Sequence, residues 1–258
     1  MTGPRPAPPE AVEYTPGHLM DVHRPVGADG PAPVVLLWHG RGSDERDVLV
    51  PLAQEAAELG LLVLVPDWRS DQEDGGRARL LASFEYARRK APAFGGDPTR
   101  FVLAGWSLGG REAVALATHP DTPEEVRPTA TVGIASAYGR PAVTTGDTPL
   151  THLAERPSPV PVWLVHGTVD DLVPASATRE LHTALVEQGS PVRLLEPETD
   201  HAGVVLTEYD PAVERCRPAR AEHAVRAGRA TARVLAEAAA ASPDDRAATP
   251  ARRPAPAP

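Results

Sequence analysis

The sequence contains a single cysteine, Cys216, so no disulfide can form within the chain. No thiol-activating pattern surrounds this residue, and we expect it to be an ordinary small side chain. Long apolar runs are also lacking, because no stretch approaches the roughly 18 apolar residues that a membrane-spanning helix requires. No apolar segment follows the opening residues, which argues against a secretory signal. We therefore expect a cytoplasmic location.

Basic charge is scarce as well. Lysine and arginine number 26 against 35 aspartate and glutamate residues, which gives a formal net charge of −9. Nucleic-acid binding needs a concentrated basic surface, so this balance argues against such a partner. We find no metal-ligand cluster of histidine and carboxylates at helical spacing and no phosphate-binding loop of the Walker type. The glycine pair Gly95-Gly96 precedes a strand rather than a helix, so a dinucleotide site is not expected. No metal or cofactor is predicted.

Short apolar runs alternate with helical patterns along the chain, which is typical of a mostly parallel sheet with helices on both faces. We expect one such domain over residues 11–241, between a disordered proline-rich segment, 1–10, and a disordered tail, 242–258. One or two antiparallel edge strands are expected within 12–24. The other predicted strands are 34–38, 61–65, 100–104, 129–135, 160–165 and 191–196, and the predicted helices are 47–59, 77–91, 108–118, 175–188 and 220–240.

A Gly-x-Ser-x-Gly sequence, residues 105–109, lies between an apolar strand and an alanine-rich helix. A strand that turns abruptly into a helix leaves its central residue strained, and side chains two positions away would collide. Glycine at positions 105 and 109 removes those side chains. Ser107 is then presented at the carboxyl end of the sheet, at the positive end of the following helix. This pattern predicts a nucleophilic serine.

A serine hydroxyl needs a neighbouring base to take its proton. We assign that role to His201, because it follows the last predicted strand in a loop that returns to the same sheet edge as Ser107. The acid that orients the base should lie between them in the chain. Asp170 and Asp171 both follow the penultimate strand, and the spacing from His166 favours Asp170. Asp171 is expected to face solvent or to cap the next helix.

The run His39-Gly40-Arg41-Gly42 directly follows the first strong strand. Glycine lets the backbone approach a substrate carbonyl closely. We expect the amides of Arg41 and Leu108 to form an oxyanion hole, with Gly42 as the alternative to Arg41.

With these residues, the chain resembles the α/β-hydrolase superfamily over about residues 12–240. The run 37–44 is similar to the phospholipase/carboxylesterase family, whereas 20–25 and 96–100 are similar to acetylesterase and dienelactone-hydrolase relatives. The resemblance implies an α/β-hydrolase fold and a Ser107, Asp170 and His201 triad. Serine stands where dienelactone hydrolases carry cysteine.

The segment between the strands that end near residue 137 and begin near 160 is too short and too rich in proline and glycine for a large helical lid. We therefore expect an open pocket and a small-molecule ester substrate with a small or medium acyl group. The candidate residues for the walls of this pocket are Trp68, Trp106 and Tyr138. The sequence is equally consistent with all three being aromatic residues of the hydrophobic core. Thioester or amide cleavage, acyl transfer, and a non-catalytic binding role stay open, as does the oligomeric state.

Overall fold

The computed structural model describes residues 9–27 and 30–241. Its main sheet has the strand order β1-β2-β4-β3-β5-β6-β7-β8. The first two strands and β4 pair antiparallel, and the pairs from β4 to β8 are parallel. These strands are β1 (Glu10–Thr15), β2 (His18–His23), β3 (Ala32–Trp38), β4 (Leu62–Pro66), β5 (Gly96–Trp106), β6 (Ala130–Ile134), β7 (Val162–Val165) and β8 (Val192–Leu195).

The segments expected to be disordered lie largely outside the described residues. The tail 242–258 and residues 1–8 are not described. Glu10, which the sequence placed in the N-terminal disordered segment, is the first residue of β1.

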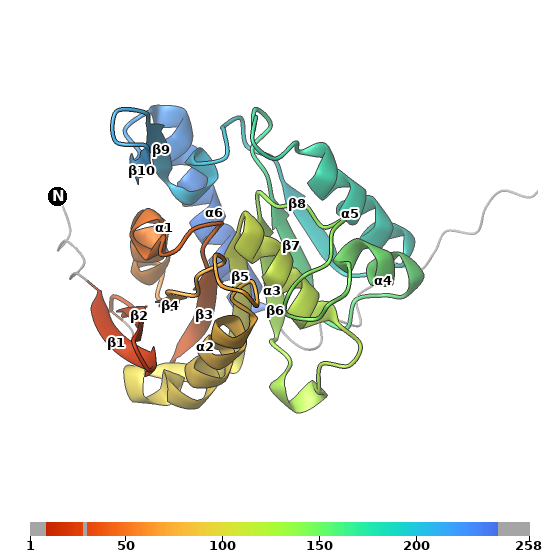
Figure 1. The fold of residues 1–258 in the computed structure, drawn as a ribbon, viewed down its shortest axis with the longest axis horizontal. Helices are drawn as coiled ribbons and strands as arrows, with labels where there is room; N and C mark the ends of the chain where they lie inside the picture. The colour runs from red at the N-terminus through yellow and green to blue at the C-terminus, as the bar shows by residue number, and fades with distance from the viewer. Residues whose placement is uncertain (1–8, 28–29, 242–258) are drawn as a thin grey trace, which may run out of the picture.

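Helices cover both faces of the sheet (Figure 1). Helices α1 and α6 pack against each other and on one face, whereas α2, α3 and α5 pack on the other, with α4 against α3 and α5. The helices are α1 (Arg46–Glu58), α2 (Arg77–Lys90), α3 (Leu108–Thr118), α4 (Pro149–Glu155), α5 (Ser176–Glu187) and α6 (Glu222–Ala240), and the short 3-10 helices are η1 (Ala91–Phe94), η2 (Glu124–Val126) and η3 (Gly203–Val205).

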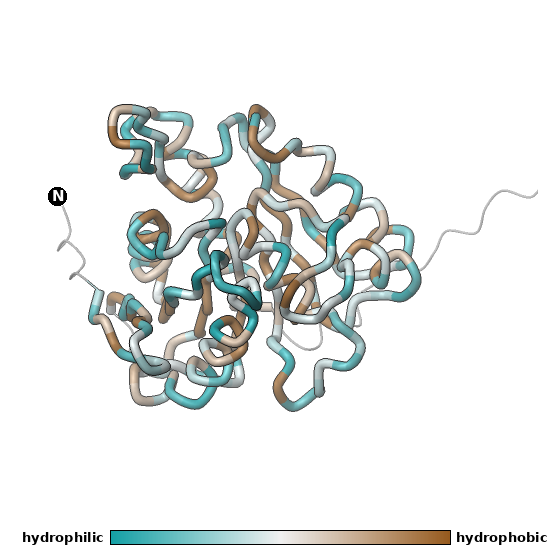
Figure 2. Tube along the Cα trace, viewed as in Figure 1, coloured by the Kyte–Doolittle hydropathy of each residue, from teal (hydrophilic) through white to brown (hydrophobic). Residues whose placement is uncertain are grey.

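Strand β3 shows why the predicted strands read as unbroken apolar runs. Val35 and Leu37 belong to the core under α1 and α6, and Leu36 belongs to the core on the opposite face. All three are fully buried. Successive side chains of a strand point to opposite faces, so a strand covered on both sides must be apolar at every position. Figure 2 shows the same pattern, with hydrophobic segments along the central strands and hydrophilic segments in the outer loops.

One α-helix and one β-hairpin were not expected from the sequence. Helix α4 occupies part of the segment between β6 and β7, and a two-stranded hairpin, β9 (Thr207–Asp210) and β10 (Arg215–Pro218), separates η3 from α6. Within the part of the chain that the structure describes, no helix combines the length and apolar character needed to cross a membrane.

Burial of His23 predicts a loss of stability in acid. The side chain ends β2 and is 4% exposed, and its Nε2 has no hydrogen-bond partner among the described residues. Burial lowers the pKa of His23 to about 4, below the ordinary histidine value of 6.5. Between these values the unfolded chain binds a proton that the folded chain does not, so the free energy of unfolding falls as the pH falls from 6.5 to 4.

When the pH falls from 7.5 to 4.5, the free energy of unfolding of the wild type should fall by about 2 kcal/mol more than that of His23→Leu. Urea unfolding of both proteins at both pH values measures this difference. Any packing change caused by leucine cancels, because each protein is compared with itself. Equal losses in the two proteins would contradict a buried neutral imidazole.

Candidate active site

Four loops that carry predicted site residues lie at the carboxyl ends of the parallel strands. The chain passes from β3 through α1 to β4 on one side of β3, and then crosses to β5 on its other side. Ligand sites of open α/β sheets lie outside the strand ends at such a switch point. The loops after β3 and β5 flank this point, and the loops after β7 and β8 lie on the same edge.

Ser107 occupies the sharp turn between β5 and α3. Its φ of 54° and ψ of −121° are strained for a residue with a side chain. A Cβ on Gly105 would overlap the carbonyl oxygen of Gly109, and a Cβ on Gly109 would overlap the carbonyl oxygen of His39. The two glycines therefore let the backbone fold back on itself and lie against the end of β3, while Ser107 stays half-buried at the turn.

Replacement of Gly105 by alanine should destabilise the fold, because the added methyl group meets main chain that cannot move away. We expect a loss of about 3 kcal/mol in the free energy of unfolding. Gly139→Ala is the matched control, since a Cβ there meets only a Leu150 methyl at 3.9 Å. Chemical unfolding measures both variants, and equal stability of the two would contradict the close approach at the turn.

Asp170 and His201 are joined by a hydrogen bond across the ends of β7 and β8. Nδ1 of His201 donates to Oδ2 of Asp170 at 2.7 Å, and both side chains are buried. The loops that carry them are packed together, because a Cβ on Gly167 would overlap the carbonyl oxygen of Thr199. The amide of Val169 also donates to Thr199. This packing holds the carboxylate beside the imidazole.

The surroundings of Asp170 keep it ionised. Burial alone would raise the pKa of this carboxyl, but hydrogen bonds from His166, His201 and the Val173 amide outweigh burial and hold the pKa well below its ordinary value. Oδ1 accepts the amides of Leu172 and Val173 at 3.0 and 2.9 Å. A charged carboxylate in this position fixes the tautomer of the imidazole that it faces.

His166 is buried beside Asp170, whereas Asp171 is exposed. His166 is fully buried, with Nε2 3.3 Å from the same Asp170 oxygen that His201 contacts. This contact was not predicted, because the spacing of His166 along the chain marks only a strand end. Asp171 is exposed, as expected for the residue that was not chosen as the acid.

Trp106 connects the histidine loop to the serine turn. Its indole Nε1 donates to the His201 carbonyl oxygen at 3.0 Å, and the two ring centroids are 5.1 Å apart. His201 is thus held against the residue that immediately precedes Ser107. The other two candidate wall residues, Trp68 and Tyr138, are at most 1% exposed and belong to the hydrophobic cores. Of the two alternatives given for these residues, pocket wall or core aromatic, their burial favours the core aromatic.

The loop of residues 39–42 after β3, called the glycine loop below, lies directly against Ser107. A Cβ on Gly40 would be 3.2 Å from the Ser107 Cβ and 3.1 Å from a carboxylate oxygen of Glu45. Arg41 follows, with an exposed side chain, and Leu108 is the first residue of α3. The amides of a first helical turn lack acceptors within the helix, so the Leu108 amide is available to a ligand.

Glu45 is a partly buried acid that the sequence did not indicate as a site residue. Its Oε2 lies 3.9 Å from His39 Nδ1 and has no hydrogen-bond partner among the described residues. Burial raises the pKa of Glu45 to about 7, and the nearby Asp47 and Asp44 add to the effect. No local pattern distinguishes this residue from the other acids of the loop.

The β9–β10 hairpin is fastened to the same loop. Arg215 of β10 pairs with Asp47 in the first turn of α1, and its guanidinium also donates to the carbonyl oxygen of Asp44 at 3.1 Å. Figure 1 shows the hairpin separate from the main sheet, beyond the end of α1. It therefore forms part of the surroundings of the glycine loop.

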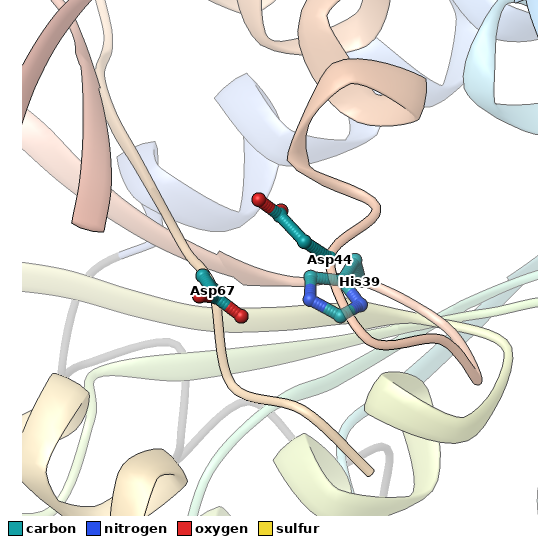
Figure 3. A group of neighbouring side chains, drawn as sticks. All are labelled: His39, Asp44 and Asp67. Atoms are coloured by element: carbon teal, nitrogen blue, oxygen red, sulfur yellow. The ribbon is translucent and has the colours of Figure 1, made fainter. Parts of the chain in front are cut away.

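A second polar group lies at the ends of β3 and β4. His39, Asp44 and Asp67 each offer one nitrogen or oxygen atom, and these three atoms lie within 4.8 Å of one another (Figure 3). Nitrogen and carboxylate oxygen are the donors that bind divalent transition metals. This group lies beside the glycine loop rather than on the side of Asp170.

No protein-family model matches the sequence, and no curated protein sequence matches it. Solved structures do match. A thermophilic esterase from the Planctomycetes species Thermogutta terrifontis, in its butyrate-bound form, superposes with a TM-score of 0.70 at 18% identity, over 89% of this chain and 92% of that one. Thermogutta terrifontis esterase 2 phosphorylated by paraoxon gives a TM-score of 0.69 at 19% identity, over 91% and 94%. The chain therefore has the α/β-hydrolase fold of these esterases.

Proposed function

We propose that this protein is a serine hydrolase that cleaves carboxylic esters of small or medium acyl groups. The observation that carries the proposal is the Asp170–His201 hydrogen bond, placed against the strained turn that bears Ser107. An ionised acid, an oriented imidazole and a serine hydroxyl on a rigid turn are the parts that nucleophilic acyl transfer needs.

In the first half of the reaction, Nε2 of His201 takes the proton of Ser107 as Oγ attacks the ester carbonyl carbon. The carbonyl oxygen becomes an oxyanion, which the amides of Arg41 and Leu108 stabilise. His201 then gives its proton to the departing alcohol oxygen as the bond to the carbonyl carbon breaks. Ser107 is left as an acyl ester.

In the second half, His201 takes a proton from water, and the resulting hydroxide attacks the acyl carbon. The bond to Ser107 Oγ breaks, His201 returns the proton to that oxygen, and the carboxylic acid leaves. Asp170 stays ionised throughout and stabilises the imidazolium that forms in each half. Each oxyanion donor contributes on the order of 3 kcal/mol to this kind of transition state.

The short acyl preference draws on two observations. The segment between β6 and β7 holds only the seven-residue helix α4, which packs on α3 and α5 and leaves little chain for a lid. The Thermogutta terrifontis esterase was solved with butyrate and with propionate bound, and we infer a similar range of acyl length for this chain. Phosphorylation of that esterase by paraoxon supports a reactive serine here as well.

Turnover of p-nitrophenyl acetate, butyrate, octanoate and palmitate tests the proposal, with the specificity constant expected to be highest for acetate or butyrate. A fluorophosphonate probe should label the protein once per chain, with the label on the peptide that contains Ser107. A non-catalytic binding protein would neither turn over the esters nor react with the probe. Labelling without ester turnover would redirect the search to thioesters and amides.

A further inference from the structure

Three potential metal ligands come from two loops that the fold brings together, one between β3 and α1 and the other after β4. His39 follows β3, Asp44 precedes α1, and Asp67 follows β4. In Figure 3 the carboxylates of Asp44 and Asp67 lie on the same side of the His39 ring. The three candidate ligand atoms are within 4.8 Å of one another.

The hydrogen bonds around His39 leave one ring nitrogen available. Nδ1 lies 3.0 Å from the carbonyl oxygen of Gly40, an acceptor that requires a proton on Nδ1. Nε2 then carries a lone pair, and it has no partner among the described residues although the side chain is fully buried. A histidine that donates through one nitrogen to a backbone carbonyl and presents the other is typical of a metal ligand.

Asp67 shows the same division of its two oxygens. Oδ2 lies 3.1 Å from Nδ1 of His18, whereas Oδ1 is buried and has no partner among the described residues. Two buried atoms that can only accept, His39 Nε2 and Asp67 Oδ1, are therefore without a donor among the described residues, and both belong to side chains of this group. Buried acceptors without a donor are costly, so a cation or a bound water is needed between them.

The charges around the group favour a cation. Asp44 and Asp21 both pair with Arg46, at 2.9 and 2.6 Å. One guanidinium thus faces two carboxylates, and Asp67 adds a third negative charge. A divalent ion would offset this excess, and Asp44, with 40% of its side chain exposed, gives solvent a path to the site.

We propose that His39, Asp44 and Asp67 bind a divalent first-row transition metal, such as zinc, beside the glycine loop. Nε2 of His39, Oδ1 of Asp67 and one oxygen of Asp44 would be the protein ligands, with water in the remaining positions. Ligand bonds of about 2.1 Å require the three atoms, which lie within 4.8 Å of one another, to close in. Asp44 accepts from the Arg46 guanidinium through both oxygens, at 3.0 and 2.9 Å, so its carboxylate would move together with that guanidinium. His18, Arg46 and the Gly40 carbonyl would orient the three ligands from outside.

Direct titration of the full-length, tag-free protein tests the site after dialysis against EDTA. Zinc should bind with a stoichiometry of one by calorimetry, and cobalt should give visible absorption bands typical of nitrogen and oxygen ligation. Zinc should also raise Tm. Failure of the wild-type protein to bind either ion would overturn the proposal and leave a bridging water as the occupant.

Asp67→Asn and Asp44→Asn should each weaken zinc binding by at least roughly tenfold. Asp71→Asn is the matched control, because this exposed aspartate pairs with Arg69 and not with the group. Its zinc affinity should equal that of the wild type. Undiminished zinc binding in Asp67→Asn would place the ion elsewhere and would also overturn the proposal. His39 is left intact in these experiments, since a fully buried side chain is prone to unfold the protein when replaced.

Discussion

Replacement of Ser107 by alanine is expected to lower kcat for p-nitrophenyl butyrate by roughly 10⁵- to 10⁶-fold. The variant keeps the turn, the imidazole and the oxyanion amides, but water must then attack the ester without a covalent intermediate. The residual rate reflects binding and oxyanion stabilisation alone. Labelling by the fluorophosphonate probe should disappear together with the ester turnover.

The size of this effect distinguishes a nucleophile from a residue that merely shapes the turn. Ser176→Ala is a suitable control, because this exposed serine begins α5 and lies outside the proposed machinery. Its kcat should match that of the wild type. Thermal melting should show that Ser107→Ala is folded, since alanine occupies the same volume without the hydroxyl. Wild-type turnover in a folded Ser107→Ala protein would reject the serine mechanism.

The serine turn was predictable from the sequence because its cause is local. A positive φ at Ser107 and the overlap that a Cβ would cause at Gly105 both arise within a few residues of chain. Apolar runs such as 34–38 were predictable for a similar reason, since burial on both faces requires apolar residues at every position. The order of nucleophile, acid and base along the chain then pointed to Asp170 and His201.

The elements that the sequence analysis missed depend on contacts between distant segments. The β9–β10 hairpin is polar and largely exposed, so it carries no apolar alternation, and its attachment through Arg215 to Asp47 spans 168 positions. The contact between His166 and Asp170 needs the loop after β7 to curl back on its own strand end. Helical spacing of metal ligands did not indicate His39, Asp44 and Asp67, because two separate loops supply them.

The choice between Arg41 and Gly42 as oxyanion donor stays a prediction for a different reason. Gly40 lies against Ser107, and the amides of Arg41 and Gly42 both follow it within two positions. A Cβ on Gly42 would meet the Glu45 side chain at 2.6 Å, and the carbonyl oxygen of Gly42 accepts the amide of Ser70 at 3.3 Å. The loop is thus packed at Gly42, whereas the side chain of Arg41 is exposed.

Asp170→Asn is expected to lower kcat/KM by about 10⁴-fold while the protein stays folded. Asparagine has the same shape, and its carbonyl oxygen can still accept the amides of Leu172 and Val173 that Oδ1 accepts in the wild type. Its amide nitrogen, however, meets Nδ1 of His201 as a donor. The imidazole must then carry its proton on Nε2, which leaves no lone pair to receive the proton of Ser107.

The control for this variant is Asp171→Asn, which makes the same chemical change at the neighbouring exposed position. It should retain nearly all of the wild-type kcat/KM, whereas Asp170→Asn should also react far more slowly with the fluorophosphonate probe. Slow labelling at an unchanged Tm identifies a loss of nucleophile activation, because a merely structural role of Asp170 would lower the melting temperature first. If Asp171→Asn lost as much activity as Asp170→Asn, the buried 2.7 Å hydrogen bond to His201 would not be the contact that activates the base.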